Sequence, residues 1–393
     1  MERSLKRVEK KDRFLERGIQ PLAEEGEEMF HQSPFPVISI EGEPYDRGFQ
    51  YGSQCKNLIE ETLKVYRKIF KHRSNLDWQQ SLQEGEKFIP IIEAYDPEIM
   101  GEIRGIAEGS GRTLEEIVLL NVRSEVAFSL VAKGRSSAGC TTLAATPDAT
   151  SSKHMLIGQN WDWHPDAQAL NVILKIKQKG RPHIVQIVEA GIIGKIGFNS
   201  AGIALVANAL ISDKWNLGVP FQVILRGILN AECMADAILA ISKAKRGSAG
   251  NFLIAHTDGE VIDIEAAPQD VNFIFPDNGI LAHSNHFTVS NPKINDFGPS
   301  IFPSTIFRRH RANKLLTMEK GDIDADSLKR VLKDHFDKPY SICWHIDTRL
   351  PESDQIQTDV SLIIDLTQKT MEIAQGPPCG HEYIPFTFED LFQ

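Results

Sequence analysis

The N-terminal third of the chain carries apolar residues at helical spacing. Between residues 57 and 72 these residues recur every three or four positions on one helical face: Leu58, Ile59, Leu63, Tyr66, Ile69 and Phe70. Asp96-Pro97 has two marks of a helix start, an N-cap aspartate and a first-turn proline, and predicts a helix that runs to about Glu108 and stops at Gly109. Thr113-Leu114-Glu115-Glu116 matches a capping box that opens another helix. This segment is therefore expected to be mostly helical.

The residues before these helices follow a less regular pattern. Residues 1–32 are highly charged and predict a solvated helix or a loose arm, whereas residues 35–40 predict a strand. Gly42, Gly48 and Gly52 predict a turn that leads into the first helix.

The pattern changes to short apolar runs after residue 139. These runs predict strands at 141–146, 155–159, 172–176, 184–189, 194–198, 203–208, 251–256, 261–265, 281–285, 361–366 and 371–374. Helical spacing returns at 220–229, 234–241, 304–318 and from an N-cap at Asp324 to about Lys333. Such an order is typical of an α+β protein in which two antiparallel sheets pack together with helices outside.

The Gly139-Cys140 junction lies where the two patterns meet. Residues 133–138 are small and polar, as in an exposed connecting loop, and the strand at 141–146 would hold the thiol rigidly. Glycine leaves the carbonyl before the cysteine open to attack. We therefore expect Cys140 to cut its own bond to Gly139. Its new α-amino group, with a pKa of about 7.7–8.0, would then take the proton of the thiol.

A different interpretation of Cys140 stays open at this point, since a lone cysteine before an apolar strand is usually a small buried hydrophobe. If the cut occurs, residues 1–139 form a mostly helical N-terminal pro-segment, or alpha chain. Residues 140–393 then form the catalytic beta chain, which begins at Cys140.

Composition restricts the partners and the compartment. The net charge of −10 argues against a general nucleic-acid binder, because phosphate contacts need basic patches. No apolar run reaches the length of a membrane span, and the charged N-terminus lacks a signal core. The odd number of cysteines and the lack of a Cys-x-x-Cys spacing predict free thiols in a reducing compartment. We expect a cytoplasmic protein without nucleic-acid or membrane partners.

An ordered set of motifs resembles one enzyme family over roughly residues 35–385. Gly139-Cys140-Thr141-Thr142 is followed by matching stretches at 158–163, 189–202, 208–210, 283–286 and 340–343, and residues 121–125 match upstream. The set resembles the acyl-coenzyme A:6-aminopenicillanic acid acyltransferase (isopenicillin-N acyltransferase) family of autoproteolytic N-terminal nucleophile (Ntn) hydrolases.

The resemblance implies an αββα sandwich, made as a precursor that splits between Gly139 and Cys140. It implies acyl transfer to or from amines through a thioester on Cys140. Asp162 matches the aspartate that positions the cysteine, and Asn285 matches an asparagine of the oxyanion site. Trp344 stands where we expect arginine in the fungal penicillin enzyme, which argues against penicillin-type substrates.

Two further polar residues have open roles. Asn208 ends an apolar strand and could be a second oxyanion donor or a structural residue. Arg308 could bind a substrate carboxylate in a bidentate contact or form a surface salt bridge.

Other constellations are weaker. His283-x-x-His286 with His256 could suggest a metal site, but no third ligand has a standard spacing, so no metal is expected. A papain-like pair of Cys140 with His154 or His164 fits the strand context poorly.

Three tryptophans, Trp161, Trp163 and Trp215, could line an acyl pocket, although core packing is their commoner role.

The sequence thus predicts a self-processing N-terminal-cysteine amidohydrolase or acyltransferase for small N-acylated amines or amino-acid derivatives. Its partners would be an acyl-amide or acyl-thioester substrate and its own two fragments, held as an alpha–beta heterodimer. No cofactor is expected, and acyl-coenzyme A is a candidate acyl donor. The alternatives are a cysteine peptidase that acts on peptides and a non-catalytic binding protein that retains the fold.

Overall fold

The computed structural model describes residue 33, residues 35–128 and residues 139–391. The predictions for residues 1–32 and for the loop at 133–138 lie outside the described residues.

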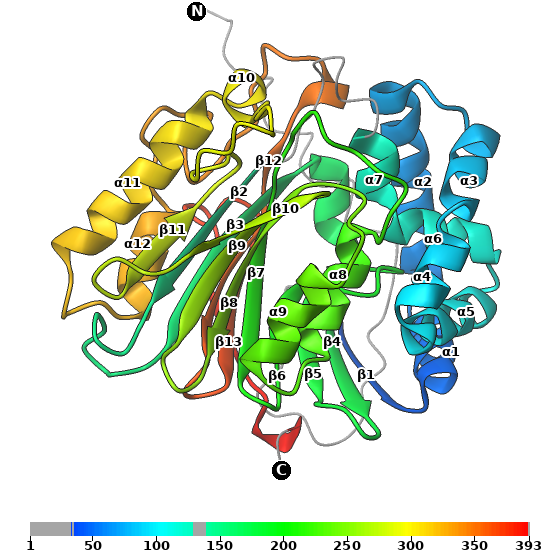
Figure 1. The fold of residues 1–393 in the computed structure, drawn as a ribbon, viewed down its shortest axis with the longest axis horizontal. Helices are drawn as coiled ribbons and strands as arrows, with labels where there is room; N and C mark the ends of the chain where they lie inside the picture. Colours follow the sequence, from blue (N-terminus) through cyan, green and yellow to red (C-terminus); the bar gives the residue numbers. More distant parts are fainter. Residues whose placement is uncertain (1–32, 34, 129–138, 392–393) are drawn as a thin grey trace, which may run out of the picture. The chain divides into compact units, whose positions relative to one another are not determined.

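Two β-sheets form the centre of the described chain (Figure 1). An eight-stranded sheet has the order β1-β4-β5-β6-β7-β8-β9-β10, and a six-stranded sheet has the order β11-β2-β3-β12-β13-β14. The first comprises β1 (Val37–Gly42), β4 (Asn171–Gln178), β5 (Ile184–Glu189), β6 (Ile196–Asn199), β7 (Ile203–Ala209), β8 (Gly250–His256), β9 (Val261–Ala267) and β10 (Asp270–Ile274). The second comprises β2 (Gly139–Ala145), β3 (Leu156–Trp163), β11 (Ile280–His283), β12 (Gln357–Asp365), β13 (Thr370–Gln375) and β14 (Ile384–Thr387).

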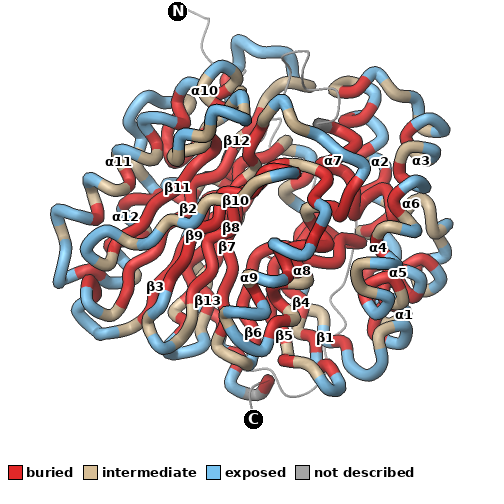
Figure 2. The backbone as a smooth tube through the Cα atoms, viewed as in Figure 1, coloured by how far each residue is buried: buried red, intermediate tan, exposed pale blue. Residues whose placement is uncertain are grey.

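Neighbouring strands run antiparallel except for β1 and β4, which pair in parallel. The sheets are buried on both faces, as Figure 2 shows in red. Their facing surfaces are joined by Gln159 on β3, whose side chain donates to the Ala207 carbonyl at 2.7 Å and accepts from the Ala207 N–H at 2.9 Å. Gln159 therefore fixes the alignment of β3 against β7.

Helices cover the outer sides of both sheets. The six-stranded sheet packs against α11 (Ser304–Met318) and α12 (Ala325–Leu332), and the eight-stranded sheet packs against α8 (Phe221–Leu229) and α9 (Met234–Ser242). Short α10 (Gly298–Ile301) precedes α11. The predicted α+β arrangement of two packed antiparallel sheets between helices is confirmed.

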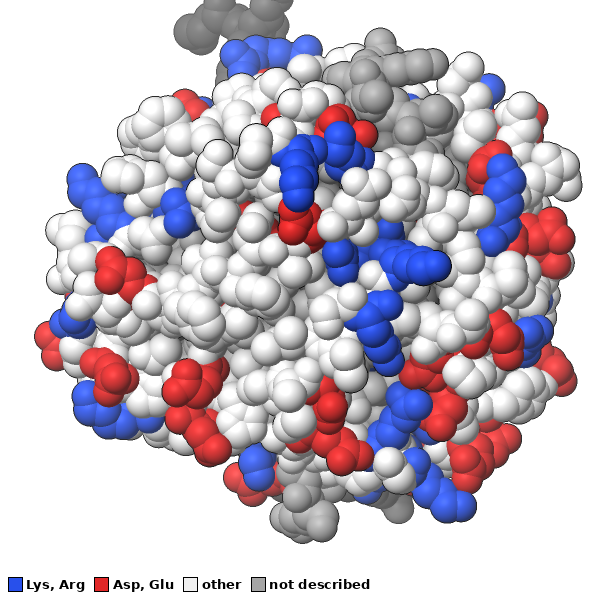
Figure 3. Space-filling view, viewed as in Figure 1, with Lys and Arg blue, Asp and Glu red and all other residues white. Residues whose placement is uncertain are grey.

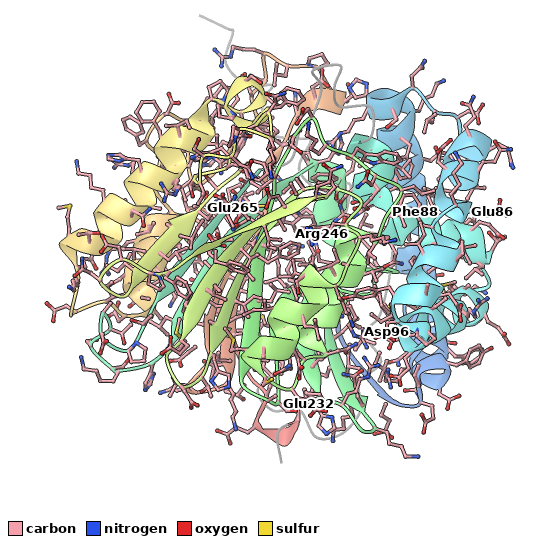
Figure 4. All side chains as sticks on the ribbon, in the orientation of Figure 1. Glu86, Phe88, Asp96, Glu232, Arg246 and Glu265 are labelled. Carbon is pink, nitrogen blue, oxygen red and sulfur yellow. The ribbon has the colours of Figure 1, made fainter. Side chains whose placement is uncertain are left out.

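Seven helices precede β2 within the described residues: α1 (Pro44–Gln54), α2 (Lys56–Ser74), α3 (Trp78–Glu86), α4 (Ile89–Tyr95), α5 (Pro97–Ser110), α6 (Leu114–Asn121) and α7 (Arg123–Phe128). Asp96, labelled in Figure 4, caps α5 as predicted by accepting from the Glu98 and Ile99 N–H groups. The capping box at Thr113 and the N-cap at Asp324 are confirmed as well.

The predicted turn around Gly48 and Gly52 is wrong, because both glycines lie inside helix α1. A Cβ at Gly48 would stand 2.0 Å from the Glu102 carbonyl oxygen of α5, and one at Gly105 of α5 would stand 2.1 Å from the Tyr45 carbonyl oxygen of α1. The missing side chains allow the two helix backbones to touch.

The predicted helix stop at Gly109 is also wrong. Gly109 packs against α1 within α5, and the left-handed residue that ends α5 is Gly111, with φ of +69°.

A buried ion network ties these N-terminal helices to α8. Glu102 on α5 binds Arg47 of α1 at 3.0 Å and Arg226 of α8 at 2.8 Å, and all three side chains are buried. Glu125 on α7 accepts from the Phe221 N–H at 2.9 Å, at the start of α8. The position of α8 thus depends on residues upstream of the Gly139-Cys140 junction.

The surface carries both signs of charge. Basic and acidic side chains are interspersed over the face drawn in Figure 3. No helix within the described ranges combines the length and the apolarity that a bilayer crossing requires.

We predict that Gly105→Ala lowers the free energy of unfolding by about 1–3 kcal/mol, because the added methyl group overpacks the α1–α5 contact. Urea denaturation would measure the change. Gly101→Ala on the same helix is the matched control, since its Cβ would meet Pro44 at an ordinary 3.7 Å. This control should be neutral or stabilise by up to about 1 kcal/mol through helix propensity. Equal stabilities of the two variants would contradict the proposed close contact.

Candidate active site

Cys140 is the second residue of β2, at the rigid strand end that the sequence predicts. It lies opposite Trp161 on β3, while Gly139 lies opposite Asp162. Since side chains alternate along a strand, the thiol and Asp162 project to opposite faces of the sheet. The thiol lines a cavity of about 50 Å³ between the two sheets.

The walls of this cavity come from both sides of the junction. Trp161 and Trp163 of β3, Lys195, Arg123 of α7 and Leu225 of α8 contribute to the lining. The two indole rings stack with centroids 6.4 Å apart. The cations lie against these rings: Lys195 Nζ is 2.6 Å from the centroid of the Trp161 ring, and the Arg123 guanidinium is 5.1 Å from that of Trp163.

Two buried side chains hold the backbone of Cys140. Its N–H donates to Asn285 Oδ1 at 2.9 Å, and its carbonyl oxygen accepts from Arg308 Nη1 at 2.6 Å. Arg308 Nη2 also donates to Asn285 Oδ1 at 2.8 Å, so the two side chains and the Cys140 backbone form a closed ring of hydrogen bonds. Asn285 lies two residues after the end of β11, and Arg308 projects from α11, so the outer elements of the six-stranded sheet position the cysteine.

Arg308 is buried, with 2% of its surface exposed, and so does not form a surface salt bridge. Its Nη1 donates additionally to Thr141 Oγ1 at 3.1 Å, and its guanidinium lies 5.3 Å from the centroid of the Trp344 ring. The guanidinium is thus occupied by the backbone and side chains around the cysteine.

Asp162 is fully buried beside the Gly139-Cys140 bond. Its Oδ1 accepts from Thr358 Oγ1 at 2.7 Å, while Oδ2 has no hydrogen-bond partner among the described residues. A Cβ on Gly139 would stand 2.7 Å from Oδ2 and 3.3 Å from the Trp344 ring. Any larger residue at this position would therefore have to displace the Asp162 carboxyl group.

Burial sets the charge state of the site. It raises the pKa of the Cys140 thiol to about 11, and Asp162 adds to the rise, while Lys195, Arg308 and the Ala209 N–H act in the opposite direction. Burial also raises the pKa of Asp162 to about 7, against the pull of Arg308 and Thr358. In the uncut chain the thiol is therefore protonated at neutral pH, and Asp162 keeps its proton to a higher pH than a free carboxyl group.

Lys195 is a further functional candidate, to which the sequence alone assigns no role. Burial lowers the pKa of its ammonium to about 7, although Glu189 opposes the change at a distance of 3.0 Å. Glu189 also binds Arg123 at 2.6 Å, and these cations hold the pKa of Glu189 below its usual value although burial alone would raise it. A single lysine inside the apolar run 190–198 was the signal that could have identified this residue.

Asn285 and Asn208 differ in which of their side-chain hydrogen-bonding groups are already engaged. Asn285 Nδ2 donates to the Ala209 carbonyl at 3.0 Å, so its amide oxygen and one N–H are already engaged. Asn208 Oδ1 accepts from Thr142 Oγ1 at 2.9 Å and from Asn251 at 3.0 Å, whereas its Nδ2 has no hydrogen-bond partner among the described residues. The oxyanion roles predicted for both stay predictions.

Comparison with known proteins identifies the family of this chain. Residues 149–378 match the family model described as acyl-coenzyme A:6-aminopenicillanic acid acyl-transferase. The acyl-coenzyme A:6-aminopenicillanic-acid-acyltransferase 40 kDa form of Emericella nidulans is 31% identical over 315 residues, which cover 78% of this chain and 84% of that protein. The chain belongs to this family of acyltransferases. It is therefore an enzyme.

Solved structures of amide hydrolases show a looser likeness to this family member. A mutant of the conjugated bile acid hydrolase of Clostridium perfringens aligns with a TM-score of 0.42 and 12% identity, over 63% of this chain and 97% of that one. Penicillin V acylase of Agrobacterium tumefaciens aligns with a TM-score of 0.41 and 11% identity, over 60% of this chain and 83% of that one.

The histidines that could have suggested a metal site have other polar partners. His283 Nε2 lies 2.9 Å from Glu265, which is labelled in Figure 4, and His286 Nδ1 lies 2.9 Å from Thr305 Oγ1. Both rings are thus engaged in hydrogen bonds.

Neither histidine considered for a papain-like pair lines the described cavity around Cys140. His154 Nδ1 lies 2.8 Å from Asp365 Oδ2, and His164 accepts from the Asp166 N–H at 3.2 Å. The expected clustering of Trp215 with Trp161 and Trp163 is wrong, because Trp215 is 44% exposed and absent from the cavity wall.

We predict that Asp162→Asn removes a pH dependence of stability. In the folded wild type Asp162 keeps its proton up to about pH 7, whereas a carboxyl group in the unfolded chain loses it near pH 4. The free energy of unfolding therefore falls as the pH rises from 4 to 7 and levels off above 7. Between pH 4 and 8 the stability difference should move in favour of the variant by up to about 4 kcal/mol.

Urea titrations would measure this shift, with both proteins carrying Cys140→Ala so that the chain stays intact. Asp148→Asn on an exposed turn is the control and should leave the profile of its parent unchanged. Parallel profiles with and without Asp162 would contradict the raised pKa.

Proposed function

We propose that this acyltransferase-family enzyme processes itself at Gly139-Cys140 and then works through Cys140 as an N-terminal nucleophile. The observation that carries the proposal is the double hold on the Cys140 backbone by Asn285 and Arg308. A cysteine that merely fills a core needs no buried side chains on both its N–H and its carbonyl. Those contacts keep its nitrogen in place when the bond to Gly139 breaks.

The processing step is an N-to-S shift. The Cys140 sulfur bonds to the Gly139 carbonyl carbon, the C–N bond breaks, and the thiol proton ends on the Cys140 nitrogen. Water then hydrolyses the thioester, which returns the thiol and leaves a carboxylate on Gly139. In turnover the same sulfur attacks the substrate carbonyl.

A base must first remove the thiol proton, because burial keeps the thiol neutral in the uncut chain. Lys195 lines the same cavity, and its pKa of about 7 makes a neutral amine available at physiological pH. The Ala209 N–H points at the sulfur and favours the thiolate. After the cut, the new α-amino group beside Asn285 and Asp162 takes over as the base.

The two fragments stay together as a heterodimer in this proposal. Strand β1 pairs with β4 over six residue positions, although the two strands lie on opposite sides of the cut. Arg123 of α7 also lines the cavity and binds Glu189 of the other fragment. The alpha chain thus supplies part of the active site.

The cavity supports small acyl-amines or amino-acid derivatives as substrates. The stacked Trp161 and Trp163 suit an apolar acyl group, and the Arg123 guanidinium in the cavity lining suits a carboxylate. The described walls leave about 50 Å³, well below the roughly 300–1,000 Å³ of a typical ligand pocket, so we infer that full access follows processing.

Water or an amine could resolve the acyl-enzyme, so hydrolysis and acyl transfer share this intermediate. The name of the Emericella nidulans relative makes acyl-coenzyme A a candidate donor for the thioester.

We predict that Cys140→Ala abolishes processing. Wild-type protein should give two fragments on a denaturing gel, and mass spectrometry should show that the larger begins Cys-Thr-Thr. The variant should remain one chain, and exposed Cys233→Ser should be cut normally. Normal cleavage of Cys140→Ala would exclude the cysteine as the nucleophile, and an uncut wild type with full activity would exclude the N-terminal amine as its base.

We predict that Lys195→Met slows processing roughly 10²–10⁴-fold, the usual effect of losing a general base. The wild-type rate should rise with pH through about 7 as the Lys195 amine loses its proton, and the variant should lack this rise. The measurement follows cleavage of freshly translated chain on a gel. Lys177→Met, at an exposed position of β4, is the control. An unchanged rate and pH profile in Lys195→Met would remove Lys195 from the mechanism.

A further inference from the structure

Four side chains from two separate segments converge beside the six-stranded sheet. His335, Cys343 and His345 belong to the loop between α12 and β12, and Cys379 follows β13. One ligand atom from each residue lies within 4.8 Å of the ligand atoms of the other three. The cluster has no familiar signature in the sequence, because its spacing is Cys-x-His with a second cysteine 34 positions after the histidine.

The distances match those around a tetrahedral ion. His335 Nε2 and His345 Nε2 are 3.0 Å apart, and His345 Nε2 is 3.4 Å from Cys343 Sγ and 3.5 Å from Cys379 Sγ. Zinc binds sulfur at about 2.3 Å and imidazole nitrogen at about 2.0 Å, so tetrahedral ligands lie about 3.3–3.8 Å apart. The three distances around His345 are close to this range, and the remaining pairs, all within 4.8 Å, need to close by at most about 1 Å.

Pairwise hydrogen bonds explain this cluster poorly. Three potential partners surround His345 Nε2, yet an imidazole nitrogen makes one hydrogen bond in the plane of its ring. The four ligand atoms instead surround a single position that a metal ion could occupy.

We propose that His335, Cys343, His345 and Cys379 bind a structural Zn²⁺ ion. Two sulfurs and two imidazoles form the Cys₂His₂ set that zinc prefers, and four protein ligands leave no open position for catalysis. Binding converts both thiols to thiolates and releases their two protons to solvent. His335 and Cys379 are exposed, so the ion has a path of entry.

The site would hold one wall of the active centre. Trp344 lies between two of the ligands, and its ring packs against Gly139 and Arg308. The Trp344 N–H also donates to Thr358 Oγ1 at 3.0 Å, and Thr358 Oγ1 donates to Asp162. A zinc ion that joins the loop around Trp344 to the turn at Cys379 would therefore fix the position of Asp162.

The test measures zinc in the full-length chain, purified with reductant after growth in zinc-supplemented medium. Elemental analysis should find stoichiometric zinc in the wild type and in Cys233→Ser, a control at an exposed cysteine outside the cluster. Cys379→Ser and His335→Ala change exposed ligands, so their folds should persist. Their zinc affinity should fall by more than the roughly 10–100-fold that loss of an outer-shell partner typically causes.

Two readouts remain available if a variant fails to fold. Co²⁺ added to metal-stripped wild type should give the intense visible bands of a tetrahedral site and a thiolate-to-cobalt charge-transfer band. Zn²⁺ should protect Cys379 from iodoacetamide and leave Cys233 reactive. Substoichiometric zinc, equal zinc in Cys379→Ser and His335→Ala, unprotected Cys379, or a Cys343–Cys379 disulfide in place of the ion would each overturn the proposal.

Discussion

The hydrogen bond from the Cys140 N–H to Asn285 Oδ1 is the contact on which the candidate site depends. It places the first residues of β2 between an asparagine that follows β11 and an arginine on α11. Arg308 is buried and forms no ion pair with a carboxylate among the described residues. Its positive charge is therefore stabilised by hydrogen bonds to the Cys140 carbonyl and Asn285 and by the nearby Asp162. Loss of any of these groups leaves another buried polar group unsatisfied, which is costly in a dry interior.

Strand β2 separates the buried site into two charge environments, one on each face of the strand. On the face of β2 that carries the thiol, Lys195, Arg123 and Glu189 form a buried cluster. On the opposite face, Asp162 has one satisfied oxygen and one oxygen that points at the α-carbon of Gly139. The backbone of the strand lies between a region rich in cations and a carboxyl group of raised pKa. The bond that is proposed to break thus has a lysine of lowered pKa on one face of the strand and a carboxyl group of raised pKa on the other.

Much of the architecture could be predicted from local signals. Helix α11 has the predicted bounds, and the caps at Asp96, Thr113 and Asp324 lie where their side-chain chemistry requires. Glycine misled the interpretation of α1, because glycine marks both flexible turns and close helix contacts. The distinction depends on what the facing helix offers, which the local sequence does not contain.

In the candidate site, too, some residues could be predicted from the sequence and others depend on contacts between distant elements. Cys140, Asp162, Asn285 and Arg308 were predicted and do come together. The electrostatic role of Lys195 could not be predicted, because it arises from burial beside Glu189 and Trp161 on other strands. Trp215 was grouped with the other tryptophans by residue type, and its exposure separates it from them.

The parallel pairing of β1 with β4 gives the N-terminal segment a role that outlasts any cut. Without residues 37–42, strand β4 would become the outermost strand and would present a bare row of amide and carbonyl groups along a largely apolar ribbon. Such an edge recruits other chains. The segment upstream of Cys140 therefore keeps this edge of β4 paired, whatever becomes of the bond that joins it to the rest.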